Sequence, residues 1–177
     1  MQENSNKNIV LIGMMGAGKS YIGGKLAKLL VHFDYVDIDS EIEKRQGTSI
    51  SEIFETHSEE YFRALEEKMI KEFSALENQI MSLGGGAFEN PKNRERLKEN
   101  GLTFYLKAPA EELFIRIKNE THRPLLKDGF SVEKIKGLLN KREKNYLKAD
   151  FIIDTNKHRA YTILNDIIKE YENYVAK

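Results

Sequence analysis

The chain has 177 residues, enough for one α/β domain with a substantial buried core. Lys and Arg number 28, as do Asp and Glu, so no long-range field favours nucleic acid or an anionic membrane. Cysteine is absent, which excludes disulfides, thiolate catalysis and zinc–thiolate sites. The polar start of the chain has no signal-peptide core and no apolar run reaches membrane-spanning length. We therefore expect a cytoplasmic protein with no nucleic-acid or membrane partner, and a monomer.

Five short apolar runs alternate with helical patterns, which is typical of a parallel sheet with crossover helices. The runs are almost continuously apolar, as in strands that are covered on both faces. They are Ile9–Ile12, Tyr35–Ile38, Gln79–Leu83, Leu102–Leu106 and Phe151–Ile153. The sequence therefore predicts an α/β fold built on five strands.

A glycine-rich turn directly follows the first apolar run and precedes a helical pattern. Its sequence is GMMGAGKS over residues 13–20. In this strand–turn–helix setting, G-x-x-x-x-G-K-[ST] cradles nucleotide phosphates with converging backbone N–H groups. Lys19 is placed to reach the outer phosphates, and the Ser20 hydroxyl can ligate Mg²⁺. The alternative is a glycine-rich turn with a solvated lysine.

Two aspartates, Asp37 and Asp39, follow the second apolar run. Strand alternation places both on one face at the carboxyl end of a strand, where open α/β sheets bind ligands. One carboxylate can serve a Mg²⁺ shell while the other accepts a hydrogen bond from a substrate hydroxyl. Alternatively, Asp39 or Ser40 only caps the next helix. Over residues 41–56 we expect two short helices, with a turn at Gly47 and a second start near Ser49.

A longer helix is predicted over residues 58–76. Its apolar residues recur at steps of three and four: Phe62, Leu65, Met69, Phe73 and Leu76. Arg63 projects from the edge of this stripe, where Glu66 and Glu67 can orient or neutralise it. From the residues alone, Arg63 and Arg142 are surface side chains by default.

Three consecutive glycines, Gly84, Gly85 and Gly86, follow the third apolar run. They remove every side chain from the end of a strand, so backbone N–H groups can come close to a ligand. A flexible turn is the alternative.

Residues 119–131 lie between two helical patterns and form a candidate mobile lid. Pro124 keeps Arg123 off helical backbone, and an arginine delivered by a closing loop can stabilise a transferring phosphoryl group. Arg116, one or two turns earlier, either stacks on a base or lies on a helix surface. The four histidines show no metal-ligand spacing.

Taken in order, these motifs resemble those of the shikimate kinases, in the nucleoside-monophosphate-kinase-like branch of P-loop proteins. The resemblance runs from Asn8 to the C-terminal helix. The matching segments are the glycine-rich turn, Asp37-Ile-Asp39, Phe62-Arg63 with Glu66, Gly84–Gly86, Arg123-Pro-Leu-Leu, Lys141-Arg142 with Tyr146, and Asp154-Thr155.

The resemblance implies a three-layer α/β/α fold whose five-stranded parallel sheet has the order 2-3-1-4-5. It implies one P-loop kinase domain over residues 1–177, with a substrate-binding segment near 39–66 and a flexible lid near 119–131. The implied reaction is ATP-dependent phosphorylation of the shikimate 3-hydroxyl, giving shikimate 3-phosphate and ADP, on the route to chorismate and the aromatic amino acids. One Mg²⁺ per active site is implied as cofactor.

Roles for individual residues follow from the same resemblance. The implied catalytic residues are Lys19, Asp39 and Arg123, and the implied metal ligands are Ser20 and Asp37. Shikimate is bound by Asp39, Arg63, Gly84, Gly85, Gly86 and Arg142, with the two arginines on its carboxylate and the aspartate on ring hydroxyls. ATP is bound by Gly16, Ala17, Gly18, Lys19, Ser20, Tyr21, Arg116, Arg123 and His158.

The chain departs from the family pattern near the adenine loop. The family usually has a proline a few residues after its Asp-Thr, whereas this chain has Ala160 near that place. His158 and Arg159 are therefore the candidates for contact with the base. Rival hypotheses are a gluconate or nucleotide kinase of the same branch, a nucleotide-gated binding protein with little turnover, and a purely structural domain.

Overall fold

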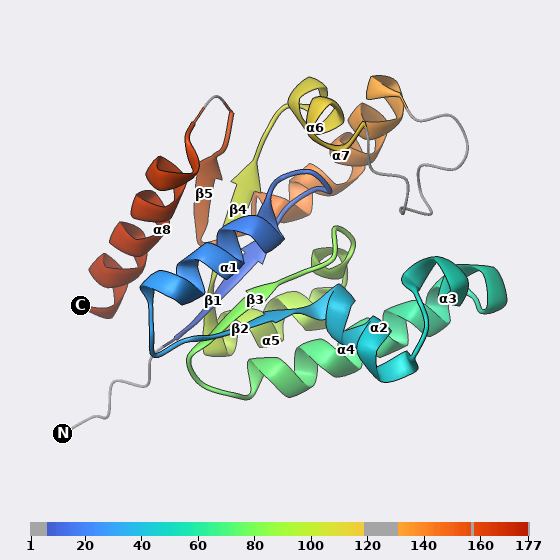
Figure 1. Cartoon of the computed structure of the whole chain (residues 1–177), viewed down its shortest axis with the longest axis horizontal. Coiled ribbons are helices and arrows are strands. Elements are labelled where there is room, and N and C mark those ends of the chain that lie inside the picture. Colours follow the sequence, from blue (N-terminus) through green and yellow to red (C-terminus); the bar gives the residue numbers. More distant parts are fainter. Residues whose placement is uncertain (1–6, 119–130, 157, 177) are drawn as a thin grey trace.

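The computed structural model describes residues 7–118, 131–156 and 158–176. Their strands form one five-stranded parallel sheet with the order β2-β3-β1-β4-β5, and helices lie on both of its faces (Figure 1). The strands are β1 (Asn8–Ile12), β2 (Asp34–Asp37), β3 (Gln79–Ser82), β4 (Gly101–Lys107) and β5 (Phe151–Asp154). The predicted strand order is confirmed, and each predicted strand end is within one residue of the observed end.

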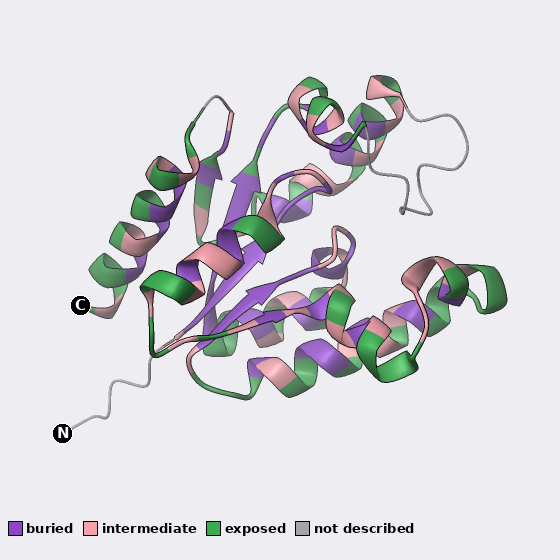
Figure 2. Cartoon of the chain, in the orientation of Figure 1, coloured by how far each residue is buried: buried purple, intermediate pink, exposed green. Residues whose placement is uncertain are grey.

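The sheet is buried at its centre and partly bare at its margins (Figure 2). Every residue of β1 and β3 is buried, as is all of β4 except its last residue. The two edge strands differ, because only Val36 of β2 and Ile153 of β5 are buried. The expectation of strands covered on both faces is thus correct for the three central strands and wrong for the two edges, which the helices do not fully cover.

The helices that connect the strands have these bounds: α1 (Lys19–Leu29), α2 (Ile38–Gln46), α3 (Ile50–Thr56), α4 (Glu59–Ser74), α5 (Pro91–Asn100), α6 (Ala110–Ile117), α7 (Val132–Tyr146) and α8 (Ala160–Val175). A short 3₁₀ helix, η1, spans Ala87–Glu89. The predicted pair of short helices over 41–56 is present. Gly47 ends α2 in the left-handed conformation, and the Ser49 side chain caps α3 in a reciprocal pair with Glu52.

Helix α4 is shorter than its apolar pattern suggested. The Ser58 side chain caps its start by accepting from the Tyr61 N–H, and the helix ends at Ser74. Leu76 therefore lies beyond the helix and is 49% exposed, so its predicted place in the apolar stripe of this helix is wrong. The stripe instead buries Glu66, which is 1% exposed. Because a buried carboxylate is costly unless it has partners, its neighbours bear directly on the site.

Among the described residues, no helix is both long and apolar enough to span a bilayer. The predicted lid at 119–131 lies outside the described residues apart from Ser131, whose hydroxyl accepts from the Lys134 N–H at the start of α7. Arg123 is likewise outside them.

Candidate active site

The turn between β1 and α1 has the backbone geometry of a phosphate-binding loop. Gly16 and Gly18 have φ of +79° and +89°, a conformation that other residues rarely adopt. A Cβ atom at Gly16 would also lie 2.8 Å from Ile117 Cγ2. Helix α1 begins at Lys19 with Gly18 as its N-cap, so its first N–H groups and positive dipole end adjoin the loop. The predicted strand–turn–helix setting is confirmed.

The Lys19 side chain folds back over this loop. Its Nζ donates to the carbonyl oxygens of Gly13 at 2.9 Å and Met14 at 3.0 Å. The ammonium group is thus held against the backbone of the phosphate loop. Tyr21, on the first turn of α1, is 59% exposed.

Asp37 joins the phosphate loop to the end of β2. The Ser20 hydroxyl donates to Asp37 Oδ2 at 2.6 Å, so the two predicted metal residues lie together. The second oxygen, Oδ1, accepts from the backbone N–H of Ser40 and caps α2. The hydroxyl of Tyr35 lies 3.3 Å from Oδ2, a contact that the sequence analysis missed. Tyr35 and Asp37 are two residues apart in one strand, and that spacing was the available signal.

Asp39 lies at the predicted place in the site, but on a helix and not on the end of a strand. The strand ends at Asp37, and Asp39 lies in the first turn of α2, so the argument from strand alternation is wrong. The capping alternative is also wrong for Asp39 and Ser40, because Asp37 is the N-cap. The Asp39 carboxylate nevertheless points at the glycine segment after β3, since its Oδ1 is 2.6 Å from where a Cβ of Gly84 would lie.

Each glycine of the segment Gly84–Gly86 makes room for a charged side chain. A Cβ at Gly84 would meet Asp39 and also Glu66 Oε1 at 2.9 Å. At Gly85 the nearest atom would be Arg142 Nη1 at 3.3 Å, and at Gly86 the Cβ would collide with the Arg63 guanidinium. The predicted close approach to these glycines is present, and the approaching groups come from α2, α4 and α7.

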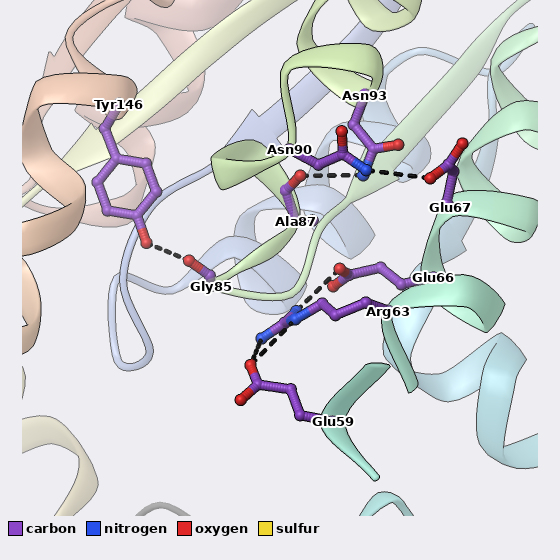
Figure 3. Close-up of polar contacts among 9 residues, drawn as sticks. All are labelled: Glu59, Arg63, Glu66, Glu67, Gly85, Ala87, Asn90, Asn93 and Tyr146. Carbon is purple, nitrogen blue, oxygen red and sulfur yellow. Dashed lines mark hydrogen bonds and ion pairs between the residues drawn. The ribbon is translucent and has the colours of Figure 1, made fainter. Parts of the chain in front are cut away.

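Arg63 and Glu66 form an ion pair on the α4 side of the glycine segment (Figure 3). Arg63 Nη1 donates to Glu66 Oε2 at 2.8 Å, and Arg63 also pairs with Glu59 at 3.2 Å. Burial raises the pKa of Glu66 to about 7, although Arg63 opposes this shift. Glu66 Oε1 has no hydrogen-bond partner among the described residues. Arg63 keeps an exposed side, which lines a groove of about 560 Å³.

Arg142 and Tyr146 approach the same segment from α7. Arg142 Nη1 lies 3.8 Å from the Met14 sulfur of the phosphate loop. The Tyr146 hydroxyl donates to the Gly85 carbonyl oxygen and lies 3.9 Å from the same sulfur. The default assignment of Arg63 and Arg142 to the surface is therefore wrong. Nothing in the sequence indicated this role for Met14, because Met14 occupies one of the unspecified positions of the G-x-x-x-x-G-K-[ST] pattern.

On the other side of the phosphate loop, Arg116 of α6 joins two segments. Its guanidinium donates to the Thr155 carbonyl oxygen at 2.8 Å and lies 3.5 Å from the Gly16 oxygen. It thus sits between the phosphate loop and the turn after β5. His158 is exposed and lines a groove of about 300 Å³ along β5 and α8, and no hydrogen bond links it to the phosphate loop within the described parts.

Comparisons with known proteins agree with this geometry. The family model for shikimate kinase matches residues 15–172. The shikimate kinase of Thermodesulfovibrio yellowstonii is 47% identical over 166 residues, which cover 94% of this chain and 95% of that protein. The shikimate kinase of Persephonella marina is 44% identical over 162 residues, 92% of this chain and 97% of its own.

A solved structure gives the same answer. Shikimate kinase from Acinetobacter baumannii in complex with shikimate is similar with a TM-score of 0.92 and 34% identity, covering 98% of this chain and 97% of that one. The chain therefore belongs to the shikimate kinase family and is a kinase that transfers a phosphoryl group from ATP to a hydroxyl group of shikimate.

Proposed function

We propose that the phosphate loop holds the triphosphate of ATP while the Gly84–Gly86 segment and its charged neighbours hold shikimate with its 3-hydroxyl toward the γ-phosphate. The loop amides and the start of α1 suit the phosphates, and Lys19 adds a positive charge beside them. Tyr21, Arg116 and His158 remain predicted contacts of ATP. Of these three, Arg116 has the strongest support, since its guanidinium contacts both Gly16 of the phosphate loop and Thr155 after β5.

We further propose that Ser20 and Asp37 hold Mg²⁺. The hydroxyl and carboxylate oxygens 2.6 Å apart are hard donors of the kind that Mg²⁺ prefers. No group of three or more His, Cys, Asp or Glu side chains within the described ranges could hold a metal ion by itself. The pair therefore suits a cation that takes its other ligands from phosphates and water. When bound, Mg²⁺ neutralises charge on the outer phosphates.

In this proposal, Arg63 and Arg142 bind the substrate carboxylate, because a guanidinium fork matches a planar acid. The two arginines approach neighbouring glycines, Arg142 at Gly85 and Arg63 at Gly86. Asp39 accepts hydrogen bonds from ring hydroxyls and aligns the attacking one. The observation that carries the proposal is this convergence of α2, α4 and α7 on Gly84–Gly86, next to the phosphate loop.

The transfer itself requires little covalent chemistry from the protein. The 3-hydroxyl oxygen forms a bond to the γ-phosphorus, the bond from that phosphorus to the β–γ bridging oxygen breaks, and ADP leaves. The hydroxyl proton passes to Asp39 or to water. Lys19 and Arg123 stabilise the charge on the transferring group. The role of Arg123, the lid over 119–131, the single domain over 1–177, the monomeric state and the cytoplasmic location remain predictions.

The test is an assay of ADP release with shikimate, gluconate and nucleoside monophosphates as alternative acceptors, followed by ³¹P NMR of the product. Shikimate should be the preferred acceptor, and the phosphate should be attached at the 3-oxygen. Brisk turnover of gluconate with none of shikimate would overturn the proposal. ATP binding without turnover of any acceptor would favour a nucleotide-gated binding protein.

A further inference from the structure

Tyr35 lies between β2 and helix α1, close to the Ser20–Asp37 pair. Tyr35 and Asp37 are two residues apart in β2, so their side chains share one face of the strand. A Cβ atom at Gly23 of α1 would collide with the Tyr35 ring and would lie 3.0 Å from Ser82 Oγ at the end of β3. Gly23 therefore leaves the room in which β2, β3 and α1 meet at one phenol.

The Tyr35 hydroxyl has two polar neighbours, Asp37 Oδ2 at 3.3 Å and Ser82 Oγ at 3.2 Å. It has one proton and can donate to only one of them. The ionised Asp37 carboxylate only accepts, and a charged acceptor makes the stronger hydrogen bond. Ser82 is 1% exposed, so its own hydroxyl proton needs an acceptor, and the Tyr35 oxygen supplies one. The arrangement that satisfies all three groups has Ser82 donating to Tyr35 and Tyr35 donating to Asp37.

Asp37 Oδ2 then accepts from two hydroxyl groups, that of Tyr35 and, at 2.6 Å, that of Ser20. An O–H bond of Ser20 that points at Asp37 leaves the lone pairs of the Ser20 oxygen available to a cation. Ser20 is exposed at the start of α1, whereas Tyr35 is half-buried against that helix. The two hydroxyls therefore differ in what they can do: Ser20 can face a cation, and Tyr35 is placed to hold the carboxylate.

We propose that Tyr35 is a positioning residue for Mg²⁺ binding: its hydroxyl holds Asp37 Oδ2 against the Ser20 hydroxyl, so that the Ser20 oxygen stays turned toward the cation. The inference rests on the proposed function, since it requires Mg²⁺ at Ser20 and Asp37. It adds a residue that touches neither the cation nor a substrate and acts through one carboxylate.

The test measures metal binding directly, with Mn²⁺ as the probe. The wild type, Tyr35→Phe and Tyr171→Phe are each mixed with less than one equivalent of ADP, so that the nucleotide is bound to the enzyme. Mn²⁺ is then titrated in, and the free ion is read from its EPR signal. Tyr171→Phe is the matched control, because the Tyr171 hydroxyl donates to the Lys7 oxygen at 2.9 Å, at the opposite end of β1 from the phosphate loop.

For Tyr35→Phe we expect the Kd for Mn²⁺ to rise about tenfold, because the carboxylate beside the metal loses one of its donors. The Kd for ADP, measured by calorimetry in EDTA, should stay within about twofold of wild type, because no metal is present in that experiment. Tyr171→Phe should leave both constants unchanged. A merely structural role for Tyr35 would lower Tm and weaken ADP binding equally with and without metal.

Two outcomes would contradict the inference alone: an unchanged Kd for Mn²⁺ in Tyr35→Phe, or an equal loss of ADP affinity in Mn²⁺ and in EDTA. Ser20→Ala separates these from a failure of the proposed metal site. If Ser20→Ala binds Mn²⁺ as tightly as the wild type, the cation is held elsewhere, and both the proposed site and the inference are wrong.

Discussion

The proposed nucleotide side of the site, which is the phosphate loop, and the proposed acid side, which is the Gly84–Gly86 segment with its charged neighbours, are built in different ways. The phosphate loop is one continuous stretch of backbone between β1 and α1, with its lysine and serine attached to it. The acid side is assembled from side chains on α2, α4 and α7 that meet at the glycines after β3. The first depends on local backbone geometry, and the second depends on how four separate segments pack.

This difference explains how each side can fail. The loop needs its glycines for its backbone conformation, but its charge is carried by one side chain, so the charge can be removed while the backbone stays in place. An assembled site can lose its function through a single added methyl group, because every member was positioned by packing. The substitutions below test the two sides in decreasing order of expected effect.

Lys19→Ala should lower kcat by several orders of magnitude, because it removes the charge beside the phosphate loop while the backbone of the loop stays intact. Turnover is measured at saturating shikimate and ATP. Lys28→Ala is the matched control, since Lys28 is exposed on the last turn of the same helix and should be silent. Rates near wild type for Lys19→Ala would contradict its assigned role.

Arg63→Ala should weaken shikimate binding by roughly 2–5 kcal/mol, because in the proposed site it removes a charge that pairs with the substrate acid. KM for ATP should change much less. Arg45→Ala serves as control, since Arg45 also pairs with two glutamates, Glu41 and Glu72, but lies outside the site. If substrate affinity survives in Arg63→Ala, the acid is bound elsewhere.

Gly84→Ala tests the packing of the acid side. Its new methyl group would lie 2.6 Å from Asp39 Oδ1 and 2.9 Å from Glu66 Oε1. We expect a stability loss of about 1–3 kcal/mol, measured by urea denaturation, together with a higher KM for shikimate. Gly137→Ala, on α7, has nothing within 4 Å of the added atom and should stabilise the protein by about 0.5–1 kcal/mol. Equal changes in stability for Gly84→Ala and Gly137→Ala would contradict the inference that Asp39 and Glu66 lie close to Gly84.

The pH dependence of stability tests Glu66. Its pKa rises from 4.5 to about 7 on folding, so between these values the folded state binds more protons than the unfolded state. The contribution to stability is therefore complete below pH 4.5 and is lost as the pH rises through about 7. Glu66→Gln should flatten this part of the profile, whereas Glu67→Gln, one residue along α4, should retain it. Parallel profiles for wild type and Glu66→Gln would show that burial does not perturb this carboxyl group.

The sequence alone was sufficient for the sheet and the phosphate loop, because both leave local patterns. Continuous apolar runs located the strands, and the turn GMMGAGKS carries its own geometry. The strand order and the roles of Arg63 and Arg142 came only from resemblance to a family. No periodicity in this chain distinguishes those arginines from solvated ones.

Other features could not be predicted because packing decides them. Helix α2 starts at Ile38 because the Asp37 carboxylate caps it, so the strand ends one residue earlier than expected and Asp39 lies on a helix. Glu66 is buried within an apolar stripe, where its charge is offset by an arginine three residues earlier. Tyr146 meets Gly85 across 61 positions of sequence, a distance over which a single sequence carries no signal.

The Asp37 carboxylate links the phosphate loop to the start of α2, because each of its two oxygens accepts a hydrogen bond from one of them. A carboxylate is planar, so its two oxygens cannot rotate independently. Any turn that withdraws Oδ2 from the Ser20 hydroxyl also shifts Oδ1 against the Ser40 N–H and the first turn of the helix that bears Asp39. A change of partner at Ser20 would therefore also disturb the first helical turn that carries Asp39, the residue proposed to bind the ring hydroxyls of the acceptor.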